Sequence, residues 1–191
     1  RNGGQTASSA AEAAKNANFA ITMLPNGKAT KEAILGADGI IAKLPKDSLI
    51  IDMSTIHPLE TDQIRKDLEE NGFSMVDAPV GRTSVEAEKG QSLFMVGAEK
   101  QDFKIAQPIL ACMGDTIIDC GGPGTGSRMK IVNNLMTTSL NVLTAQVLTF
   151  SDATGLDRDV ALKVMAGTAA GRGHMSTTSV SYTHLTLPTT L

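Results

Sequence analysis

Five short apolar runs, each bounded by turn residues, constrain the fold of this chain more than any other feature of its sequence. Helical patterns separate the runs. Strands that alternate with helices are typical of a parallel sheet covered by helices on both faces, so the sequence predicts a doubly wound α/β architecture. The predicted strands are Phe19–Leu24, Ser48–Met53, Phe73–Asp77, Ser92–Val96 and Thr116–Asp119.

Two stretches between these runs are the clearest predicted helices. Pro58–Asn71 has a proline in its first turn, acidic residues early and Gly72 directly after its end, and these are helix start and stop signals. Glu99–Met113 is the second, and Pro108 is expected to kink it because proline removes a backbone donor. Residues 1–17 predict a loop and a small helix, without the apolar region of a signal peptide.

The pattern changes after the glycine-rich segment Cys120–Gly126, where the chain becomes helical. Helices are predicted over Ser127–Ala153 and Asp157–Met165. A glycine-rich hinge before a long, mostly apolar helix indicates a domain boundary. We predict an α/β domain over residues 1–122 that begins partway into its fold, the start of a helical domain over 123–178, and a non-native tail over 179–191 that resembles a fusion scar.

The composition excludes several classes of protein. The 191 residues are 41% hydrophobic and 19% charged, with a net charge of −3, which allows a sizeable core but gives no basic footprint for nucleic acid. Cys112 and Cys120 are too few for a disulfide framework, and no cysteine or histidine has metal-ligand spacing. We interpret His57 as structural, whereas His174 lies in a glycine-rich loop that could approach a ligand. The lack of a disulfide framework predicts a reduced, cytoplasmic location. No apolar run reaches the roughly 18 residues of a membrane span.

Two loops are placed to bind a ligand, because open parallel sheets bind ligands beyond the carboxyl ends of their strands. Met23–Asn26 follows the first predicted strand, and Ser54–Pro58 follows the second. Their amides and hydroxyls are suited to line a cofactor crevice. The alternative is turn and helix-capping chemistry, which Pro-Asn-Gly and Ser-Thr segments also favour.

A third loop, Asp77–Ser84, places Gly81 and Arg82 before a predicted helix. Backbone amides at a helix start beside a guanidinium form a good anion site, although a surface arginine at a turn fits the same pattern. The segment Gly121–Arg128 superficially resembles a phosphate-binding loop. Ser127 stands where that motif needs lysine, so we reject this reading.

A narrow polar stripe runs along the predicted long helix. Lys130, Asn133, Asn134, Thr137 and Asn141 are spaced to share one helical face, and that face meets either water or a cavity that binds something polar. A lysine held among apolar walls can donate a proton, and neighbouring amides can orient a substrate, so we favour the cavity. The residues expected to be buried around the stripe are Met129, Ile131, Val132, Leu135, Met136, Leu140 and Val142.

Five ordered segments, ITMLPN, IDMSTIHP, DAPVGRTS, GGPGTGSRMKIVNN and VMAGTAAGRGH, together resemble the β-hydroxyacid dehydrogenases. The resemblance covers about residues 10–178. It implies a Rossmann domain that binds NAD, joined to an all-helical domain by one long helix. The family's opening strand and its G-x-G-x-x-G turn are absent from this sequence, so the predicted Rossmann sheet is incomplete and these residues alone are expected to bind the cofactor weakly or not at all.

The resemblance also implies roles for individual residues. Lys130 matches the family's catalytic lysine. Gly81-Arg82-Thr83 replaces the serine and two glycines of relatives that act on hydroxyisobutyrate, as in members that reduce a sulfonated aldehyde in sulfoquinovose breakdown. The predicted substrate contacts are Gly81, Arg82, Thr83, Asn133, Asn134 and Thr137, and the predicted cofactor contacts are Met23, Leu24, Pro25 and Thr55.

The expected function is therefore NADH-dependent reduction of a small sulfonated aldehyde, with Lys130 as the proton donor. Two alternatives stay open at this point. One is a related dehydrogenase or reductase acting on hydroxyisobutyrate or on a carboxylated semialdehyde such as tartronate or succinic semialdehyde. The other is a non-catalytic, cofactor-binding scaffold on the same fold. A homo-oligomer through the helical domain is implied for the full-length protein, and the choice between NAD and NADP is left open.

Overall fold

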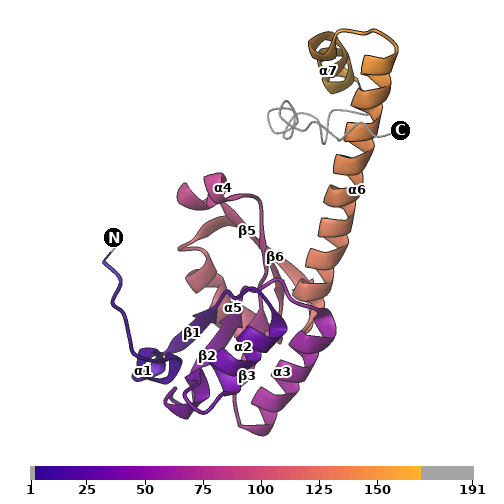
Figure 1. The fold of residues 1–191 in the computed structure, drawn as a ribbon. Helices are drawn as coiled ribbons and strands as arrows, with labels where there is room; N and C mark the ends of the chain where they lie inside the picture. Colours follow the sequence, from indigo (N-terminus) through magenta and orange to yellow (C-terminus); the bar gives the residue numbers. More distant parts are fainter. Residues whose placement is uncertain (1–2, 169–191) are drawn as a thin grey trace. The chain divides into compact units, whose positions relative to one another are not determined.

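The structure, a computed structural model, describes residues 3–168 (Figure 1). The predictions for His174 and for the tail over 179–191 lie outside the described residues. The chain divides into two compact units, Arg1–Val132 and Asn133–Leu191, and the division falls inside helix α6 (Thr125–Ala153). The domain boundary predicted at residues 122–123 lies directly before α6 and stays a prediction.

One sheet organises the first unit, and it contains all five predicted strands. Strands β1, β2 and β3 pair in parallel, and so do β5 and β6, which confirms the predicted α/β class. The strand order is β1-β2-β3-β5-β4, with β6 paired to β5. The strands are β1 (Phe19–Thr22), β2 (Leu49–Asp52), β3 (Ser74–Asp77), β4 (Val80–Gly81), β5 (Ser92–Gly97) and β6 (Gly114–Gly121).

The sheet is less uniformly parallel than the sequence pattern suggests. Strand β5 runs antiparallel to β3, and the two meet only at their carboxyl ends, where Asp77 pairs with Gly97. Strand β4 also runs antiparallel to β5, pairing Val80 with Phe94. Two residues are too few to give a periodicity, so β4 could not be recognised from the sequence.

Several helices begin directly after a residue whose side chain caps their first amides. Helix α3 starts at Pro58 behind His57, whose Nδ1 accepts from the Leu59 amide at 3.2 Å, which confirms the structural role assigned to His57. Helix α5 ends at Leu110, two residues beyond Pro108. The remaining helices are α1 (Ala10–Ala14), α2 (Gly27–Leu35), the 3-10 turn η1 (Ile40–Ala42), α4 (Ser84–Glu88) and α7 (Arg158–Gly167).

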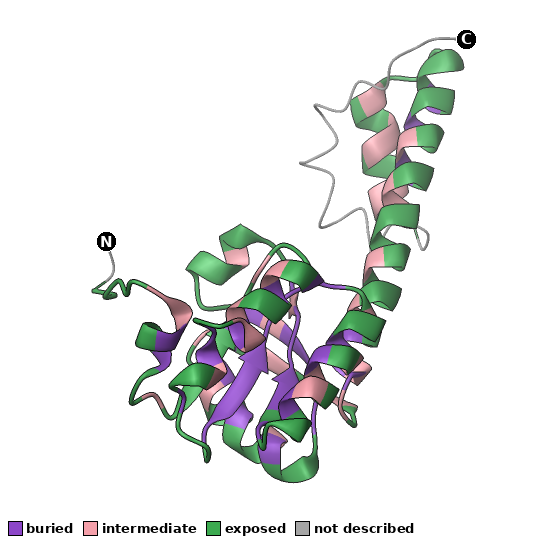
Figure 2. Cartoon of the chain, turned by 60° about the horizontal axis from the view of Figure 1, so that its bottom comes forward, coloured by how far each residue is buried: buried purple, intermediate pink, exposed green. Residues whose placement is uncertain are grey.

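The central strands of the sheet are buried (Figure 2), and clusters of apolar side chains pack on both faces of the sheet. Along β2, Ile50 packs on one face with Ile64 and Leu68 of α3. Its neighbour Ile51 packs on the other face with Phe94. Because successive strand residues point to opposite faces, a strand buried on both sides reads as an unbroken apolar run. This is why β2 was easy to predict.

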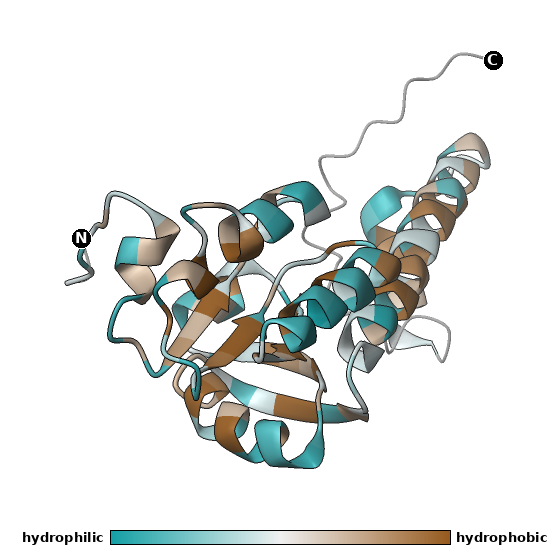
Figure 3. Cartoon of the chain, turned by 90° about the horizontal axis from the view of Figure 1, so that it is seen from below, coloured by the Kyte–Doolittle hydropathy of each residue, from teal (hydrophilic) through white to brown (hydrophobic). Residues whose placement is uncertain are grey.

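Helix α6 corrects one prediction from the sequence. The apolar residues expected to be buried around its polar stripe are instead exposed, with Leu135 at 68% and Val132 at 62% relative exposure, and only Leu140 is half-buried. Figure 3 shows hydrophobic segments along α6 as well as on the sheet. A helix buries only what a neighbour covers, and the described residues leave this surface open. The exposed members are Met129, Ile131, Val132, Leu135, Met136 and Val142.

The second unit is described by the later part of α6 and by α7. Asp157 caps α7 by accepting from the Val160 amide at 3.0 Å, and Arg158 forms an ion pair with Asp152. Leu148 is the buried apolar residue of this part of α6, at 4% exposure. Among the described residues, no helix is both long enough and apolar enough to cross a membrane.

Candidate functional site

A row of buried polar residues crosses the carboxyl edge of the parallel strands. Thr22 on β1, Asp52 on β2 and Asp77 on β3 are register partners. The two aspartates are each only 1% exposed. A buried charge is costly unless it is paired or hydrogen-bonded, so an aspartate that ends a buried strand marks a place where the fold needs a polar contact. The sequence analysis gave neither aspartate a role.

Asp52 ties the two predicted cofactor loops together. Its Oδ1 accepts from Thr22 Oγ1 at 2.8 Å and from Ser54 Oγ at 2.6 Å. Ser54 Oγ in turn accepts from the Leu24 amide at 2.9 Å. Burial raises the pKa of Asp52, against the lowering effect of these hydroxyl donors. The loop after β1 is thus fixed to the loop after β2 through one hydroxyl group.

The four residues predicted to touch the cofactor lie on these two loops. Met23, Pro25 and Thr55 are exposed, and Leu24 is half-buried. Side chains at the carboxyl edge of a parallel sheet are placed where such sheets bind their ligands, and the role of these four as cofactor contacts stays a prediction. The capping interpretation is correct for one residue: Asn26 Oδ1 accepts from the Ala29 amide at 2.9 Å and caps α2.

Helix α6 begins at this same edge. Asp77 Oδ1 accepts from the Gly124 amide at 2.6 Å, and its Oδ2 accepts from the Ser127 amide at 2.7 Å. Lys130 follows Ser127 by three residues, about one helical turn. It is half-buried, and burial lowers the pKa of its ammonium group. Lys130 makes no hydrogen bond or ion pair with any other described residue, so its proton is available to a ligand.

Helix α3 holds the start of α6 from the side. Thr61 Oγ1 and Ser127 Oγ share a hydrogen bond of 3.2 Å. The Arg128 guanidinium binds both carboxylate oxygens of Asp62, at 2.6 and 3.1 Å. The Asp62–Arg128 pair is solvent-exposed and contributes little to stability by itself, but it adds a second point of attachment.

Backbone amides of the segment Gly121–Arg128 are bound by a carboxylate of the chain itself. Two amides of this segment, those of Gly124 and Ser127, donate to the Asp77 carboxylate. An internal carboxylate therefore lies where a phosphate-binding loop would bind an anion. This agrees with the rejection of the motif from the sequence.

Asp77 makes the stability of the fold depend on pH. Burial raises the pKa of Asp77 to about 6 from its ordinary value of 3.8. Because the folded state binds this proton more tightly than the unfolded state, stability should fall as pH rises from about 4 to 6.5. In Asp77→Asn that component is absent. The difference in unfolding free energy between wild type and variant should change by up to about 3 kcal/mol over this range, as measured by urea unfolding. A difference that is constant with pH would contradict the assignment.

The predicted anion site is arranged differently from the expectation. Arg82 has a positive φ of 67°, and its guanidinium donates to Asp115 Oδ1 at 2.7 Å and Thr116 Oγ1 at 2.9 Å. The Thr83 amide donates to Glu86 Oε2 at 2.9 Å as part of a capping box, so it is not a free amide for a substrate. Gly81 pairs with Leu93 between β4 and β5.

The remaining predicted substrate contacts belong to the second unit. Asn133 and Thr137 are exposed, and Asn134 is half-buried. Thr137 Oγ1 donates to the Asn133 carbonyl oxygen at 3.0 Å. Their role as substrate contacts stays a prediction.

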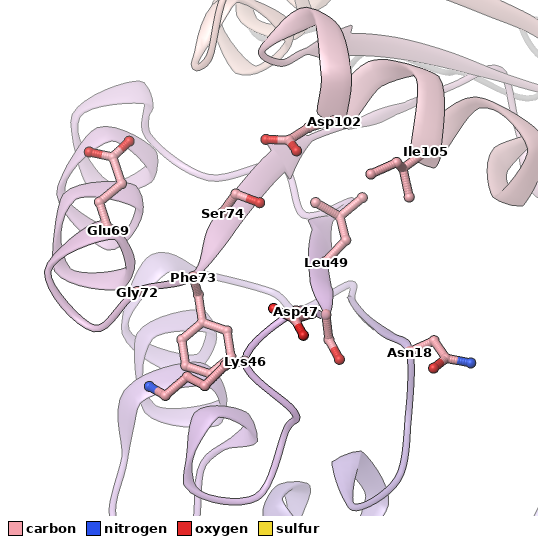
Figure 4. A pocket seen from close by; sticks show the side chains of 11 residues that line it. Asn18, Lys46, Asp47, Leu49, Glu69, Gly72, Phe73, Ser74, Asp102 and Ile105 are labelled. Atoms are coloured by element: carbon pink, nitrogen blue, oxygen red, sulfur yellow. The ribbon is translucent and has the colours of Figure 1, made fainter.

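A cavity of about 390 Å³ lies at the opposite edge of the sheet (Figure 4). Asn18, Leu49 and Ser74 line it, and they mark the amino ends of β1, β2 and β3. No predicted site residue lines this cavity. Within residues 3–168, no group of three or more histidine, cysteine, aspartate or glutamate side chains is arranged to hold a metal ion.

Comparison with known proteins now places the chain. Residues 1–122 match the family described as the NAD binding domain of 6-phosphogluconate dehydrogenase. The chain belongs to this family. Its fold and its predicted cofactor, NAD, therefore agree with the family's description, and the resemblance drawn from the sequence is confirmed.

Relatives of this family member include two groups of named enzymes. The chain is 48% identical over 175 residues to 3-sulfolactaldehyde reductase of Escherichia coli, covering 92% of this chain and 59% of the relative. It is 39% identical to mitochondrial 3-hydroxyisobutyrate dehydrogenase of Mus musculus, covering 85% of this chain and 49% of the relative. The solved structure of Mycobacterium tuberculosis 3-hydroxyisobutyrate dehydrogenase with L-serine is 25% identical, with a TM-score of 0.77, and the match covers 95% of this chain and 73% of that one. The chain thus spans about three-fifths of the length of the first curated relative.

Proposed function

We propose that the full-length protein, meaning this chain with any residues that adjoin it, reduces 3-sulfolactaldehyde to 2,3-dihydroxypropane-1-sulfonate with NADH. The observation that carries the proposal is the placement of Lys130. Its half-buried ammonium, which has no partner among the described residues, follows a helix start that is anchored at the same sheet edge as the two cofactor loops. Similarity to the Escherichia coli reductase supports the choice of substrate.

Lys130 is the proton donor in this proposal. NADH, when bound, would supply the hydride to the carbonyl carbon, and negative charge would develop on the aldehyde oxygen. The Lys130 ammonium hydrogen-bonds that oxygen and transfers its proton to it, which gives the alcohol. Met23, Leu24, Pro25 and Thr55 are the proposed cofactor contacts. The proposed substrate-orienting residues Asn133, Asn134 and Thr137 rest on their spacing after Lys130 in the sequence.

Arg82 is the proposed anion-binding residue, with Gly81 and Thr83 beside it. A guanidinium is permanently charged and offers several donors to a tetrahedral anion. In the structure Arg82 Nη1 donates to the Gln91 carbonyl oxygen and to Asp115, and Nη2 donates to Thr116. A sulfonate would therefore bind the remaining donors or exchange with Asp115. The Thr83 amide is excluded from the proposed contact because Glu86 accepts from it.

Replacing Arg82 should change selectivity rather than chemistry. Arg82→Gly suits the positive φ at this position, so the fold should tolerate it. Loss of charge-assisted hydrogen bonds, each about 1.5–3 kcal/mol, should raise KM for the sulfonated aldehyde by roughly 10- to 100-fold. KM for an uncharged aldehyde of similar size should change less than about twofold, as steady-state kinetics would measure. Equal loss for both aldehydes would remove Arg82 from this role.

Two other functions are tested by the same assay. A carboxylate would also bind Arg82, and the similarity to 3-hydroxyisobutyrate dehydrogenases supports an enzyme of that kind as the second candidate. Steady-state kinetics of the full-length protein should therefore be measured with a panel of four substrates, each with NADH and with NADPH. The substrates are 3-sulfolactaldehyde, tartronate semialdehyde, succinic semialdehyde and methylmalonate semialdehyde. The highest kcat/KM for sulfolactaldehyde supports the proposal, whereas a preference for a carboxylated substrate replaces it. Cofactor binding without any turnover would favour a scaffold.

A further inference from the structure

We propose that Asp77 is a positioning residue for Lys130: it fixes the start of α6 to the sheet and so sets where the ammonium lies. The inference rests on the proposed role of Lys130 as proton donor. Asp77 is the last residue of β3, and its two amide donors lie 47 and 50 residues later in the chain. One side chain thus joins the carboxyl edge of the parallel strands to the helix that carries the proposed catalytic group.

Both carboxylate oxygens of Asp77 are used in this attachment. Oδ1 accepts from the Gly124 amide and Oδ2 from the Ser127 amide, at 2.6 and 2.7 Å. The first amides of a helix have no partner within the helix and carry partial positive charge, so an ionised carboxylate is the best acceptor for them. An amide side chain of the same shape offers one acceptor oxygen and places an NH₂ group against the second donor.

Close backbone packing holds the start of α6 in place against the sheet. A Cβ on Gly126 would lie 2.3 Å from the Met95 carbonyl oxygen and 2.7 Å from that of Asp77. A Cβ on Gly97 would lie 2.6 Å from Asp77 Oδ1 and 2.7 Å from the Gly126 nitrogen. Helix, strand and carboxylate therefore touch directly, and the helix start cannot move without breaking these contacts.

The attachment of α6 also sets the position of Lys130, because a shift at the start of a helix moves the residues of the next turn with it. Lys130 is about one turn from Ser127. A tilt or a shift of about 1 Å at the helix start moves the ammonium by a comparable amount, and a misplacement of that size can cost on the order of 100-fold in rate. Loss of one Asp77 contact should therefore act on the rate through Lys130.

A double-mutant cycle in the full-length protein tests this coupling. Asp77→Asn should lower kcat about 30-fold while KM for NADH changes less than about twofold. In the Lys130→Ala background, Asp77→Asn should lower kcat less than about threefold further, because the group it positions is gone. The matched control is Asp52→Asn, the equally buried register partner on β2. Asp52→Asn should raise KM for NADH, and its effect should be the same in both backgrounds.

The outcomes separate the two proposals. Equal losses from Asp77→Asn in both backgrounds, or an unchanged kcat in Asp77→Asn, overturn the positioning role. Full activity of Lys130→Ala overturns the proposed function instead. If Asp77→Asn does not fold, Ser127→Pro takes its place in the cycle, because proline is tolerated in a first helical turn. It removes the amide that donates to Asp77 and also the hydroxyl that bonds Thr61, and both attach the same helix start. The same non-additivity with Lys130→Ala is then expected, and additive losses overturn the proposal.

Discussion

Replacing Lys130 with alanine should lower kcat for aldehyde reduction about a thousandfold in the full-length protein. A positioned general acid contributes roughly 10² to 10⁴ to a rate, and the other cation on this helix start, Arg128, is bound to Asp62. The dissociation constant of NADH should change less than about twofold, because Lys130 is proposed to contact the aldehyde oxygen rather than the cofactor. Single-turnover kinetics and an NADH fluorescence titration measure the two quantities separately.

Lys66→Ala is a suitable control for Lys130→Ala. Lys66 is an exposed lysine on α3, eight residues beyond the start of that helix. The kcat of the Lys66→Ala enzyme should therefore stay at the wild-type level. A Lys130→Ala enzyme with more than a third of wild-type kcat would show that water or another group supplies the proton. The lysine would then have no part in the chemistry.

Gly126→Ala should destabilise the protein by about 3 kcal/mol, at the upper end for overpacking. The added Cβ would meet backbone atoms on β3 and β5, the nearest being the Met95 carbonyl oxygen at 2.3 Å. Backbone atoms of a central sheet cannot rotate away as a flexible side chain can. Relief therefore requires α6 to leave its place on the sheet, which also removes Lys130 from the site.

Gly122→Ala, in the short segment before α6, provides the matched control. A Cβ at Gly122 would have no atom within 4 Å, so its unfolding free energy should stay within about 0.5 kcal/mol of wild type. Urea unfolding of both variants measures the contrast. If Gly126→Ala were as stable as Gly122→Ala, the close contact between α6 and the sheet would be refuted, and the positioning role of Asp77 with it.

Local signals explain which parts of the fold were predictable. The strands through Ile50 and Val76 are buried on both faces, so their apolar runs stand out. The start of α3 carries its own capping residue and proline. In contrast, Leu135 and Val132 are apolar residues that the helical period predicts to be buried, but they are exposed. Burial depends on neighbouring elements, which a helical period does not specify.

The candidate site also has parts that were predictable from the sequence and parts that were not. The cofactor loops were predictable, because in a parallel sheet a loop that follows a strand lies at the carboxyl edge. Lys130 was found through its helical spacing and through the resemblance to a family. The partners of Arg82 at Asp115 and Thr116, and those of Asp77, were not predictable because they lie far away in the chain. A hydrogen-bonding side chain does not specify its acceptor or donor at such separations.

The sequence by itself determined the α/β class, every strand of the sheet except β4, and which loops lie at the ligand-binding edge, since these depend on local periodicity and on the direction of parallel strands. Only the tertiary structure decided how helix α6 is attached. That attachment requires the Asp77 carboxylate, two amides near residue 125 and two glycine backbones to meet at one point. Hydrogen bonds and close packing act through space over a few ångströms, and the order of residues along the chain does not record which of them will come that close.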